Sequence, residues 1–288
     1  MPREVEEYSA PTISGPDRDT RTPRLTLPSG ACDCHAHVFG PQSKFRYAAK
    51  RSYTPPDASP GDYLKMLNTL GVERGVLVQP SIYGTDNAAM CEALASAKGS
   101  LRGIAVVDEA VTDNELGRMH QLGVRGLRLR AADAFALKIA ARIALLGWHI
   151  QFRVSNENFG EVEPLLKKLP VDIVVDHIGQ VPLKEGVAGP NFQAILRMAG
   201  TGRCWVKLSA PMRMSEQEFP YSDVTPFVRS LVKEAPERMV WGTDWPHPQI
   251  KKKMPNDADL VDLLSDWIPD AATRNRILAQ NPARLYGF

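Results

Sequence analysis

The chain has 288 residues, 43% hydrophobic and 24% charged, which suits one barrel domain or two smaller domains. The net charge of +2 is too small to indicate a nucleic-acid or membrane partner, and no apolar run approaches the roughly 20 residues that cross a bilayer. Residues 1–30 lack the apolar core of a signal peptide, so we expect a flexible N-terminal arm on a cytoplasmic protein.

From about residue 31, a short apolar run followed by an amphipathic helical stretch recurs along the chain. The apolar runs are Ala31–Val38, Arg74–Pro80, Leu101–Val107, Val124–Arg130, Trp148–Val154, Val171–His177, Arg203–Ser209 and Arg238–Asp244. The helical stretches between them are Gly61–Leu70, Asn87–Lys98, Asp113–Leu122, Ala134–Leu146, Asn158–Leu169, Asn191–Ala199 and Val224–Glu234. Apolar strands without strict alternation are typical of a parallel sheet that is covered by helices.

Eight strand–helix repeats predict a single (β/α)8 TIM-like barrel over residues 31–288. The tail Asp259–Phe288 is predicted to add two extra helices. A doubly wound open sheet is the alternative, but it rarely needs eight units, and no Gly-x-Gly-x-x-Gly follows the first strand. The long excursion at residues 39–59, which includes Tyr47, is either a lid that contacts substrate or a plain surface loop.

Histidine and aspartate side chains occur at the ends of several predicted strands, where barrels of this kind place their chemistry. His35 and His37 are two residues apart and therefore point to the same side of a strand, so they can converge on a metal ion or a substrate oxygen. His177 follows the sixth strand and Asp244 follows the eighth. Burying such groups unpaired costs several kcal/mol, so packing alone does not explain their recurrence. We expect these four residues to form the catalytic group.

Arginines and a serine mark other strand ends. Arg128 and Arg130 belong to the fourth strand, Arg153 to the fifth, Arg213 follows the seventh, and Ser81 follows the second. Guanidinium groups bind carboxylates through paired, charge-assisted hydrogen bonds. Because four of them at one barrel mouth would repel each other, the pattern predicts a small anionic substrate.

Three motifs carry a resemblance to a known family. They are Asp33-Cys34-His35-Ala36-His37-Val38-Phe39-Gly40-Pro41, Val174-Val175-Asp176-His177-Ile178-Gly179 and Trp241-Gly242-Thr243-Asp244-Trp245-Pro246-His247-Pro248. From about residue 25 onward the chain resembles the amidohydrolase superfamily, in the branch of 2-pyrone-4,6-dicarboxylate lactonase, sulfomuconolactone hydrolase and galactarolactone isomerase. The resemblance implies that Arg128, Arg130 and Arg213 hold substrate carboxylates. Arg153 stands where the lactonase has a tyrosine, and this extra cation would fit a sulfonate or a differently placed carboxylate.

The metal requirement can be argued from both the residues and the resemblance. The fourth strand offers arginines, which cannot bind metals, and His149 lies roughly 13 Å before Arg153 along the fifth strand at about 3.3 Å per residue. His35, His37, His177 and Asp244 would suffice for one zinc or manganese ion. The resemblance points the other way, because the lactonase works without a divalent metal. We expect no required cofactor, with a single-ion site as the alternative.

Together these features predict hydrolytic opening of a carboxylated lactone, such as a pyrone dicarboxylate or a muconolactone-type compound from aromatic-compound degradation. Asp244 would act as general base while His35, His37 and His177 polarise the carbonyl, and Ser81 and Tyr47 would join the arginines in binding substrate. The alternatives are a zinc-dependent hydrolase of a sulfonated lactone, a lactone isomerase or decarboxylase of the same superfamily, and a non-catalytic binder of aromatic or sugar acids. A homo-oligomer is left open.

Overall fold

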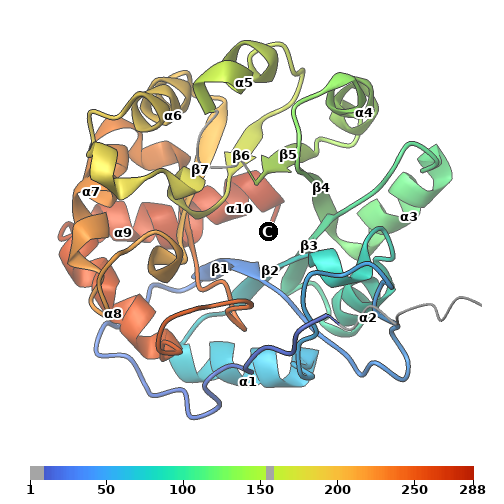
Figure 1. Ribbon diagram of the computed structural model, residues 1–288, viewed down its shortest axis with the longest axis horizontal. Helices are drawn as coiled ribbons and strands as arrows, with labels where there is room; N and C mark the ends of the chain where they lie inside the picture. The colour runs from blue at the N-terminus through green and yellow to red at the C-terminus, as the bar shows by residue number, and fades with distance from the viewer. Residues whose placement is uncertain (1–9, 154–158) are drawn as a thin grey trace, which may run out of the picture.

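The computed structural model describes residues 10–153 and 159–288 as eight parallel strands in sequential order, with helices around them (Figure 1). The strands are β1 Cys32–Ala36, β2 Arg74–Val78, β3 Leu101–Ala105, β4 Val124–Leu129, β5 His149–Phe152, β6 Ile173–Val175, β7 Cys204–Ser209 and β8 Met239–Gly242. Each lies within its predicted run, although the predicted fifth-strand end at Val154 is outside the described residues. The (β/α)8 prediction is confirmed, and an open sheet is excluded because β8 returns to β1.

Ten α-helices occur in the described part of the chain. They are α1 Pro60–Leu70, α2 Ala88–Ser96, α3 Asp113–Leu122, α4 Ala134–Ala144, α5 Phe159–Leu166, α6 Pro190–Gly200, α7 Thr225–Glu234, α8 Asp257–Trp267, α9 Ala271–Asn275 and α10 Asn281–Tyr286. Capping explains several ends: Ser59 caps α1, and the left-handed Gly71 (φ 75°) ends it. No helix among the described residues has both the length and the apolar character needed to cross a membrane.

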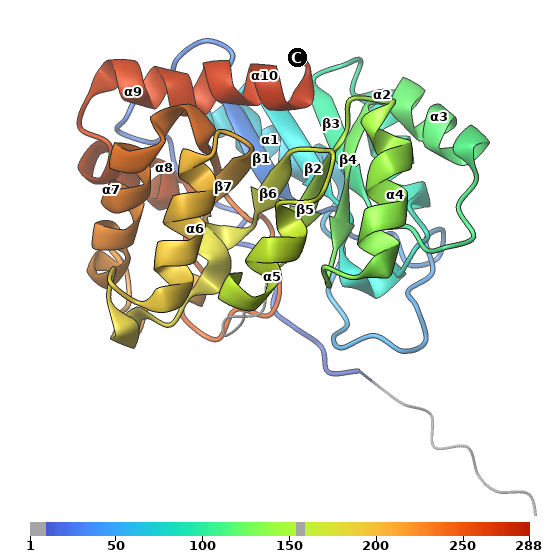
Figure 2. The ribbon, with the colours of Figure 1, turned by 90° about the horizontal axis from the view of Figure 1, so that it is seen from above.

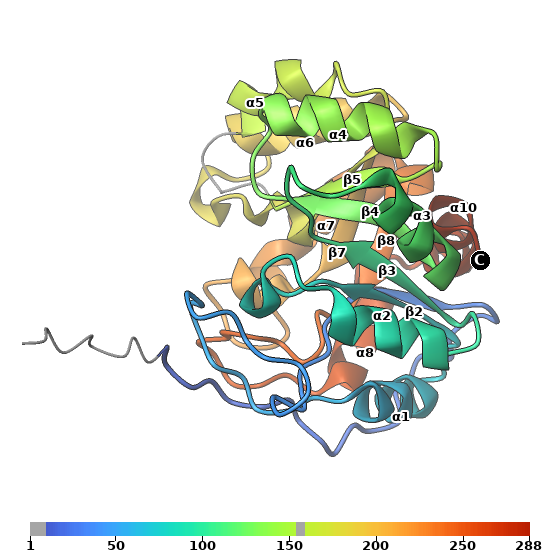
Figure 3. The same cartoon turned by 90° about the vertical axis from the view of Figure 1, so that its right-hand side faces the viewer.

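The C-terminal segment adds two α-helices beyond the eighth helix of the barrel, as the sequence predicts, although the predicted range Asp259–Phe288 also covers most of α8. α8 takes the eighth helix position, and α9, a π-helical turn at Arg276–Gln280 and α10 follow it across the end of the barrel where the strands begin (Figures 2 and 3). Tyr286 of α10 is fully buried and belongs to the same apolar cluster inside the barrel as Cys34 and Trp205. The opposite end, which carries the loops after the strands, is left accessible.

The barrel closes where β1 meets β8. The Asp244 N–H donates to the His35 carbonyl at 2.8 Å, and the His37 N–H donates to the Trp245 carbonyl at 2.7 Å. The buried Asp33 carboxylate accepts hydrogen bonds from Thr243 N and Oγ1 at 2.9 and 2.6 Å, and another from the His35 N–H at 3.1 Å. These contacts place His35 beside Asp244.

Gly242 at the end of β8 lies at the same closure, and its lack of a side chain is needed there. A Cβ at this position would lie 2.7 Å from the His35 backbone nitrogen and 3.1 Å from Asp33 Oδ1. Any larger residue would therefore push β1 away from β8.

Residues 10–30 lie against the barrel. Thr12 forms a bridge with Thr54, and the Asp262 carboxylate on α8 accepts from the backbone N–H groups of Arg24 and Leu25 at 2.8 and 3.0 Å. Residues 1–9 lie outside the described residues. The division of the chain into a flexible arm and a barrel domain stays a prediction.

Asp262 should give this docking a measurable pH dependence. Burial alone would raise the pKa of Asp262, but the hydrogen bonds from Leu25 and Arg24 lower it below its ordinary value. A lowered pKa in the folded state contributes stability above pH ~4, which is lost as the pH falls through the folded-state value. We expect Asp262→Asn to lower the free energy of unfolding at pH 7 by about 1–2 kcal/mol.

The measurement is urea denaturation of the wild type and the variant at several pH values between 7 and 3. The difference between them should shrink as the pH falls. Asp266→Asn, at an exposed position on the same helix, is the control. A difference that is zero at pH 7, or that grows on acidification, would contradict this role of Asp262.

Candidate active site

A cavity of about 490 Å³ opens where the strands end. Its wall includes residues from most of the predicted strand ends, namely His37, Ser81, Arg128, Arg130, Arg153, His177, Arg213 and Asp244. His35 lies just beneath the wall and is fully buried. Nine of the ten residues that the sequence predicts for the site therefore lie together at the ends of the strands.

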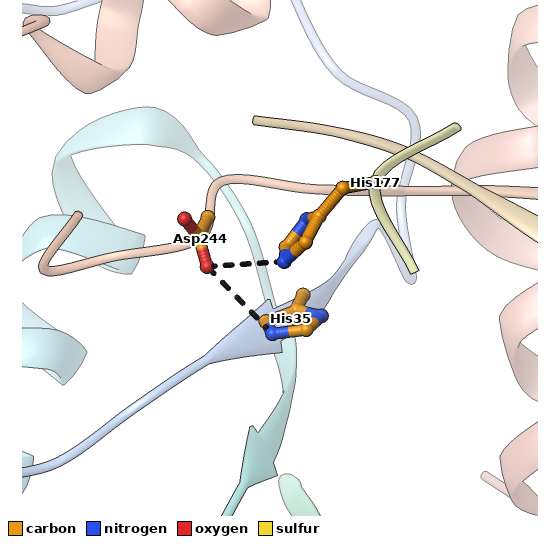
Figure 4. A group of neighbouring side chains, drawn as sticks. All are labelled: His35, His177 and Asp244. Carbon is orange, nitrogen blue, oxygen red and sulfur yellow. Dashed lines mark ion pairs between the residues drawn. The ribbon is translucent and has the colours of Figure 1, made fainter. Parts of the chain in front are cut away.

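Three histidines converge on one oxygen of Asp244. Oδ1 lies 3.7 Å from His35 Nε2, 3.6 Å from His37 Nε2 and 3.7 Å from His177 Nε2. Figure 4 shows His35 and His177 approaching this oxygen from β1 and from the segment after β6. Among the described residues, Asp244 Oδ1 and His35 Nε2 have no hydrogen-bond partner, so both are available to a substrate, a water molecule or an ion.

The Nδ1 atoms of His37 and His177 have hydrogen-bond partners that bear on which ring nitrogen carries the hydrogen. His37 Nδ1 lies 2.6 Å from the Val78 carbonyl, an acceptor only, so Nδ1 carries the hydrogen and Nε2 presents a lone pair. His177 Nδ1 lies 2.9 Å from the Ser209 hydroxyl, which can donate or accept. Burial lowers the pKa of His177 to about 3 and that of His35 well below its ordinary value. Both imidazoles are therefore neutral at pH 7.

Arg213, predicted to bind substrate, is engaged with Asp244 in this structure. Its Nε and Nη2 both lie 2.7 Å from Asp244 Oδ2. Burial would raise the pKa of Asp244, but the Arg213 charge and the neighbouring histidines hold it well below its usual range. Asp244 is consequently a carboxylate with one oxygen held by arginine and the other facing the histidines.

Arg128 is likewise paired, with Asp176. Its Nε and Nη2 lie 3.0 and 2.9 Å from Asp176 Oδ2, while it also forms part of the cavity wall. Arg130 and Arg153 line the cavity without an ion pair to any described residue. Desolvation, followed by the charges of Arg128 and Arg213, lowers the pKa of Arg153. The wall thus carries unneutralised positive charge, which favours an anionic ligand.

Tyr47 is not in the cavity wall, and the structure indicates Tyr53 instead. The Tyr47 ring packs against Tyr83 at 5.4 Å between centroids, with Arg51 over its face. Tyr53 lines the cavity and is 3% exposed; burial raises its pKa to about 12, opposed by a hydrogen bond to Ser81. Ala48 and Lys50 of the same excursion also line the cavity, so this loop contributes to the site.

Lys207 on β7 is a further residue of this site. It is fully buried, and its ammonium group lies 3.4 Å from His35 Nδ1 and 3.8 Å from Asp176 Oδ1. Burial lowers the pKa of Lys207 to about 8, although Asp176 opposes the shift, so the side chain is charged at pH 7. In the sequence, this site residue can be recognised as a lysine within an otherwise largely apolar strand.

The backbone around the site is unusual. His177 (φ 50°) and Asp244 (φ 70°) both adopt the left-handed conformation, as do Ile178, Gln180 and His247. Residues with a side chain rarely adopt it, and such strain is typical of functional sites. The ring of His247 bonds to Asp257 at 3.1 Å, away from the cavity, which suits a loop-ordering role.

The donor set fits a single divalent ion. One ligand atom each from His35, His177 and Asp244 lies within 4.8 Å of the others, all are buried, and nitrogen and carboxylate oxygen are the ligands that zinc accepts. Ligands about 2.1 Å from a tetrahedral ion are about 3.4 Å apart, close to the 3.6–3.7 Å separations from Asp244 Oδ1. His149 lines a separate cavity with Trp148 and Trp205, in accord with the expectation that it does not join this group.

Residues 32–288 match the amidohydrolase family, and the chain belongs to this family. It is 39% identical to a 2-pyrone-4,6-dicarboxylate hydrolase of Comamonas testosteroni over 92% of both chains. It is also 35% identical to a 4-sulfomuconolactone hydrolase of Hydrogenophaga intermedia, covering 100% of this chain and 98% of the relative. The chain is accordingly an enzyme of the hydrolase type, as its motifs predict.

Solved structures agree. A structure from Agrobacterium tumefaciens superposes with a TM-score of 0.85 at 26% identity, covering 94% of this chain and 99% of that one. A probable 2-pyrone-4,6-dicarboxylic acid hydrolase from Acinetobacter baumannii, with citric acid bound, gives a TM-score of 0.80 at 28% identity, covering 90% and 100%. Both support the barrel assignment.

Proposed function

We propose that this enzyme hydrolyses a lactone that carries carboxylate or sulfonate groups, of the pyrone dicarboxylate or muconolactone type. The observation that carries the proposal is the Asp244 carboxylate, surrounded by three histidines at the base of an arginine-lined cavity. The named activities of relatives at 35–39% identity support it.

Asp244 is the general base in this proposal. Its Oδ1 takes a proton from a water molecule, and the water oxygen attacks the ring carbonyl carbon. The Nε2 lone pair of His37 accepts a hydrogen bond from the same water, so we assign His37 to the water rather than to the carbonyl. His35 and His177 polarise the carbonyl and stabilise the oxyanion. The ring C–O bond then breaks, the ring oxygen receives the proton from Asp244, and the new carboxylic acid releases its remaining proton to solvent to become a carboxylate.

Arg130 and Arg153 bind the anionic groups of the substrate in this proposal, with Tyr53 and Ser81 as further hydrogen-bonding groups. Arg128 and Arg213 hold Asp176 and Asp244 in place and also border the cavity. One substrate carboxylate or sulfonate at Arg130 and Arg153 neutralises one of these two positive charges, and a second anionic group would neutralise the other.

His35, His37, His177 and Asp244 would hold a zinc or manganese ion if the enzyme uses one. Such an ion supplies Lewis-acid polarisation of the carbonyl and a more acidic water. We propose that no cofactor is required. A hydrogen on His177 Nε2 can interact with the lone pairs that converge at Asp244 Oδ1, as a metal ion would. Ser209 can donate to Nδ1 and so stabilise that tautomer.

Isomerisation is the second candidate, because the chain is 28% identical to a D-galactarolactone isomerase from Agrobacterium fabrum over 92% of its length. Hydrolysis adds water across the ring ester, whereas isomerisation does not. Turnover in 18O-labelled water, followed by mass spectrometry of the product, separates the two. One labelled oxygen per product molecule supports hydrolysis.

Replacing the general base should abolish most turnover. We expect Asp244→Asn to lower kcat for lactone opening by about 100-fold or more, since an amide cannot accept the proton. Steady-state kinetics with 2-pyrone-4,6-dicarboxylate and 4-sulfomuconolactone give the measurement. Asp266→Asn controls for the substitution type, and circular dichroism checks folding. Near-normal kcat in a folded Asp244 variant would rule out this role.

An arginine that only holds substrate should affect binding rather than turnover. We expect Arg153→Met to raise KM by about tenfold or more while kcat stays within about threefold, because an ion-pair contact formed equally in ground and transition states is lost. The matched control is Arg118→Met, at an exposed position on α3. An unchanged KM for every active lactone would remove Arg153 from the binding site.

Chelation tests the cofactor proposal. We expect purified enzyme to contain much less than one zinc or manganese per chain by elemental analysis, and to retain its activity after dialysis against a chelator. About one ion per chain, with activity that is lost on chelation and restored by that ion, would establish the single-ion alternative.

A further inference from the structure

The buried Lys207 has three hydrogen-bond acceptors around its ammonium group, one for each of its hydrogens. They are the Cys34 carbonyl at 2.7 Å, Gln151 Oε1 at 2.6 Å and His35 Nδ1 at 3.4 Å. An ammonium group has donors only, so His35 Nδ1 must be the acceptor in its contact. A neutral imidazole that accepts at Nδ1 carries its hydrogen at Nε2.

Asp176 competes for the same nitrogen but is poorly placed to hold it. Its Oδ1 lies 3.2 Å from His35 Nδ1 yet has no aligned hydrogen-bond partner among the described residues. Its Oδ2 accepts from Arg128 and from Gln151 Nε2 at 3.0 Å each. These bonds hold the carboxylate in an orientation in which a hydrogen on His35 Nδ1 would be poorly aligned with Oδ1, so Asp176 is the weaker of the two partners while Lys207 is present.

Gln151 links Lys207 to Asp176 and fixes the arrangement. Its amide oxygen faces the ammonium group of Lys207, and its NH2 faces the carboxylate of Asp176. Turning the amide over would place oxygen against carboxylate and NH2 against ammonium, so only one orientation is stable. All of these groups are buried, which makes an unmatched donor or acceptor costly.

We infer that Lys207 is a positioning residue that selects the Nε2–H tautomer of His35, so that His35 presents a hydrogen-bond donor to the reacting oxygen. This inference rests on the proposed lactone hydrolysis for its catalytic meaning. His35 Nε2 lacks a partner among the described residues and faces Asp244 Oδ1, so its hydrogen is available to a developing oxyanion. His37, held by Val78, has the opposite tautomer, and the two histidines thus have different roles.

The same tautomer bears on metal binding. A nitrogen that carries a hydrogen has no lone pair for an ion. For His35 to become a ligand through Nε2, its hydrogen would have to move to Nδ1, against the Lys207 ammonium. Lys207 therefore favours the cofactor-independent form of the site.

The first test is 15N NMR of the wild-type enzyme labelled at histidine, with the His35 signals assigned by comparison with His35→Gln. Protonated and unprotonated ring nitrogens have well-separated shifts. We expect the hydrogen of His35 on Nε2 in the wild type. A hydrogen on Nδ1 would overturn the inference, whatever the enzyme hydrolyses.

The second test is Lys207→Met, with Lys138→Met on the exposed face of α4 as control. Without the ammonium group, the His35 hydrogen should move to Nδ1, toward Asp176. On a lactone that the wild type hydrolyses, kcat should fall by at least about tenfold while KM stays within about threefold. An unchanged tautomer and kcat in the folded variant would overturn the inference. If the variant does not fold, the wild-type spectrum still decides.

The two proposals can fail separately. If the wild type opens none of the lactones, the proposed function fails, while the His35 tautomer can still be read by NMR. If lactones are opened with the His35 hydrogen on Nδ1, the proposed function stands and the role of Lys207 falls.

Discussion

The closure of the barrel between β1 and β8 is the constraint on which the site depends. Asp33 connects the two strands through hydrogen bonds to Thr243 and to the backbone of His35, residues that are distant in sequence but adjacent across the closure. Burial raises the pKa of Asp33 to about 6, and the hydrogen bonds of Thr243 and His35 oppose that shift. Since His35 and Asp244 immediately flank these contacts, the bonds that complete the fold also set the distance between the catalytic groups.

The charged side chains of the site fall into two groups, those with an ion-pair partner and those without one. Asp176 is matched by Arg128 and Lys207, and Asp244 is matched by Arg213. Both of these buried acids thus have a cation beside them, which is the condition under which burial of charge is tolerated. The cations at the rim, Arg130 and Arg153, have no such partner among the described residues. The structure consequently separates positive charge that supports the site from positive charge that is free to bind an anion.

Much of the fold and of the site was predictable from the sequence, because those parts depend on local sequence pattern. The parts that were not predictable depend on contacts between distant segments. Strand periodicity and the strand-end rule located the eight strands and the convergence of His35, His37, His177 and Asp244, because both depend on local pattern. The pairing of Arg128 and Arg213 with acids could not be read, because it depends on side-chain directions between strands. The path of an irregular loop has no period, so Tyr47 and Tyr53 could not be distinguished. A lysine in an apolar strand shows its partners only in three dimensions.

The left-handed backbone at Asp244 affects how this enzyme could be engineered. Asparagine and glycine adopt that conformation at lower cost than most residues, and neither would bury a charge there. Either substitution would also leave Arg213 without its ion-pair partner, so the backbone strain relieved at position 244 is set against a cation that becomes unpaired. Natural proteins often sacrifice stability at sites that activity requires. A thermostability screen on this scaffold therefore has to score turnover in the same round, or hold position 244 fixed.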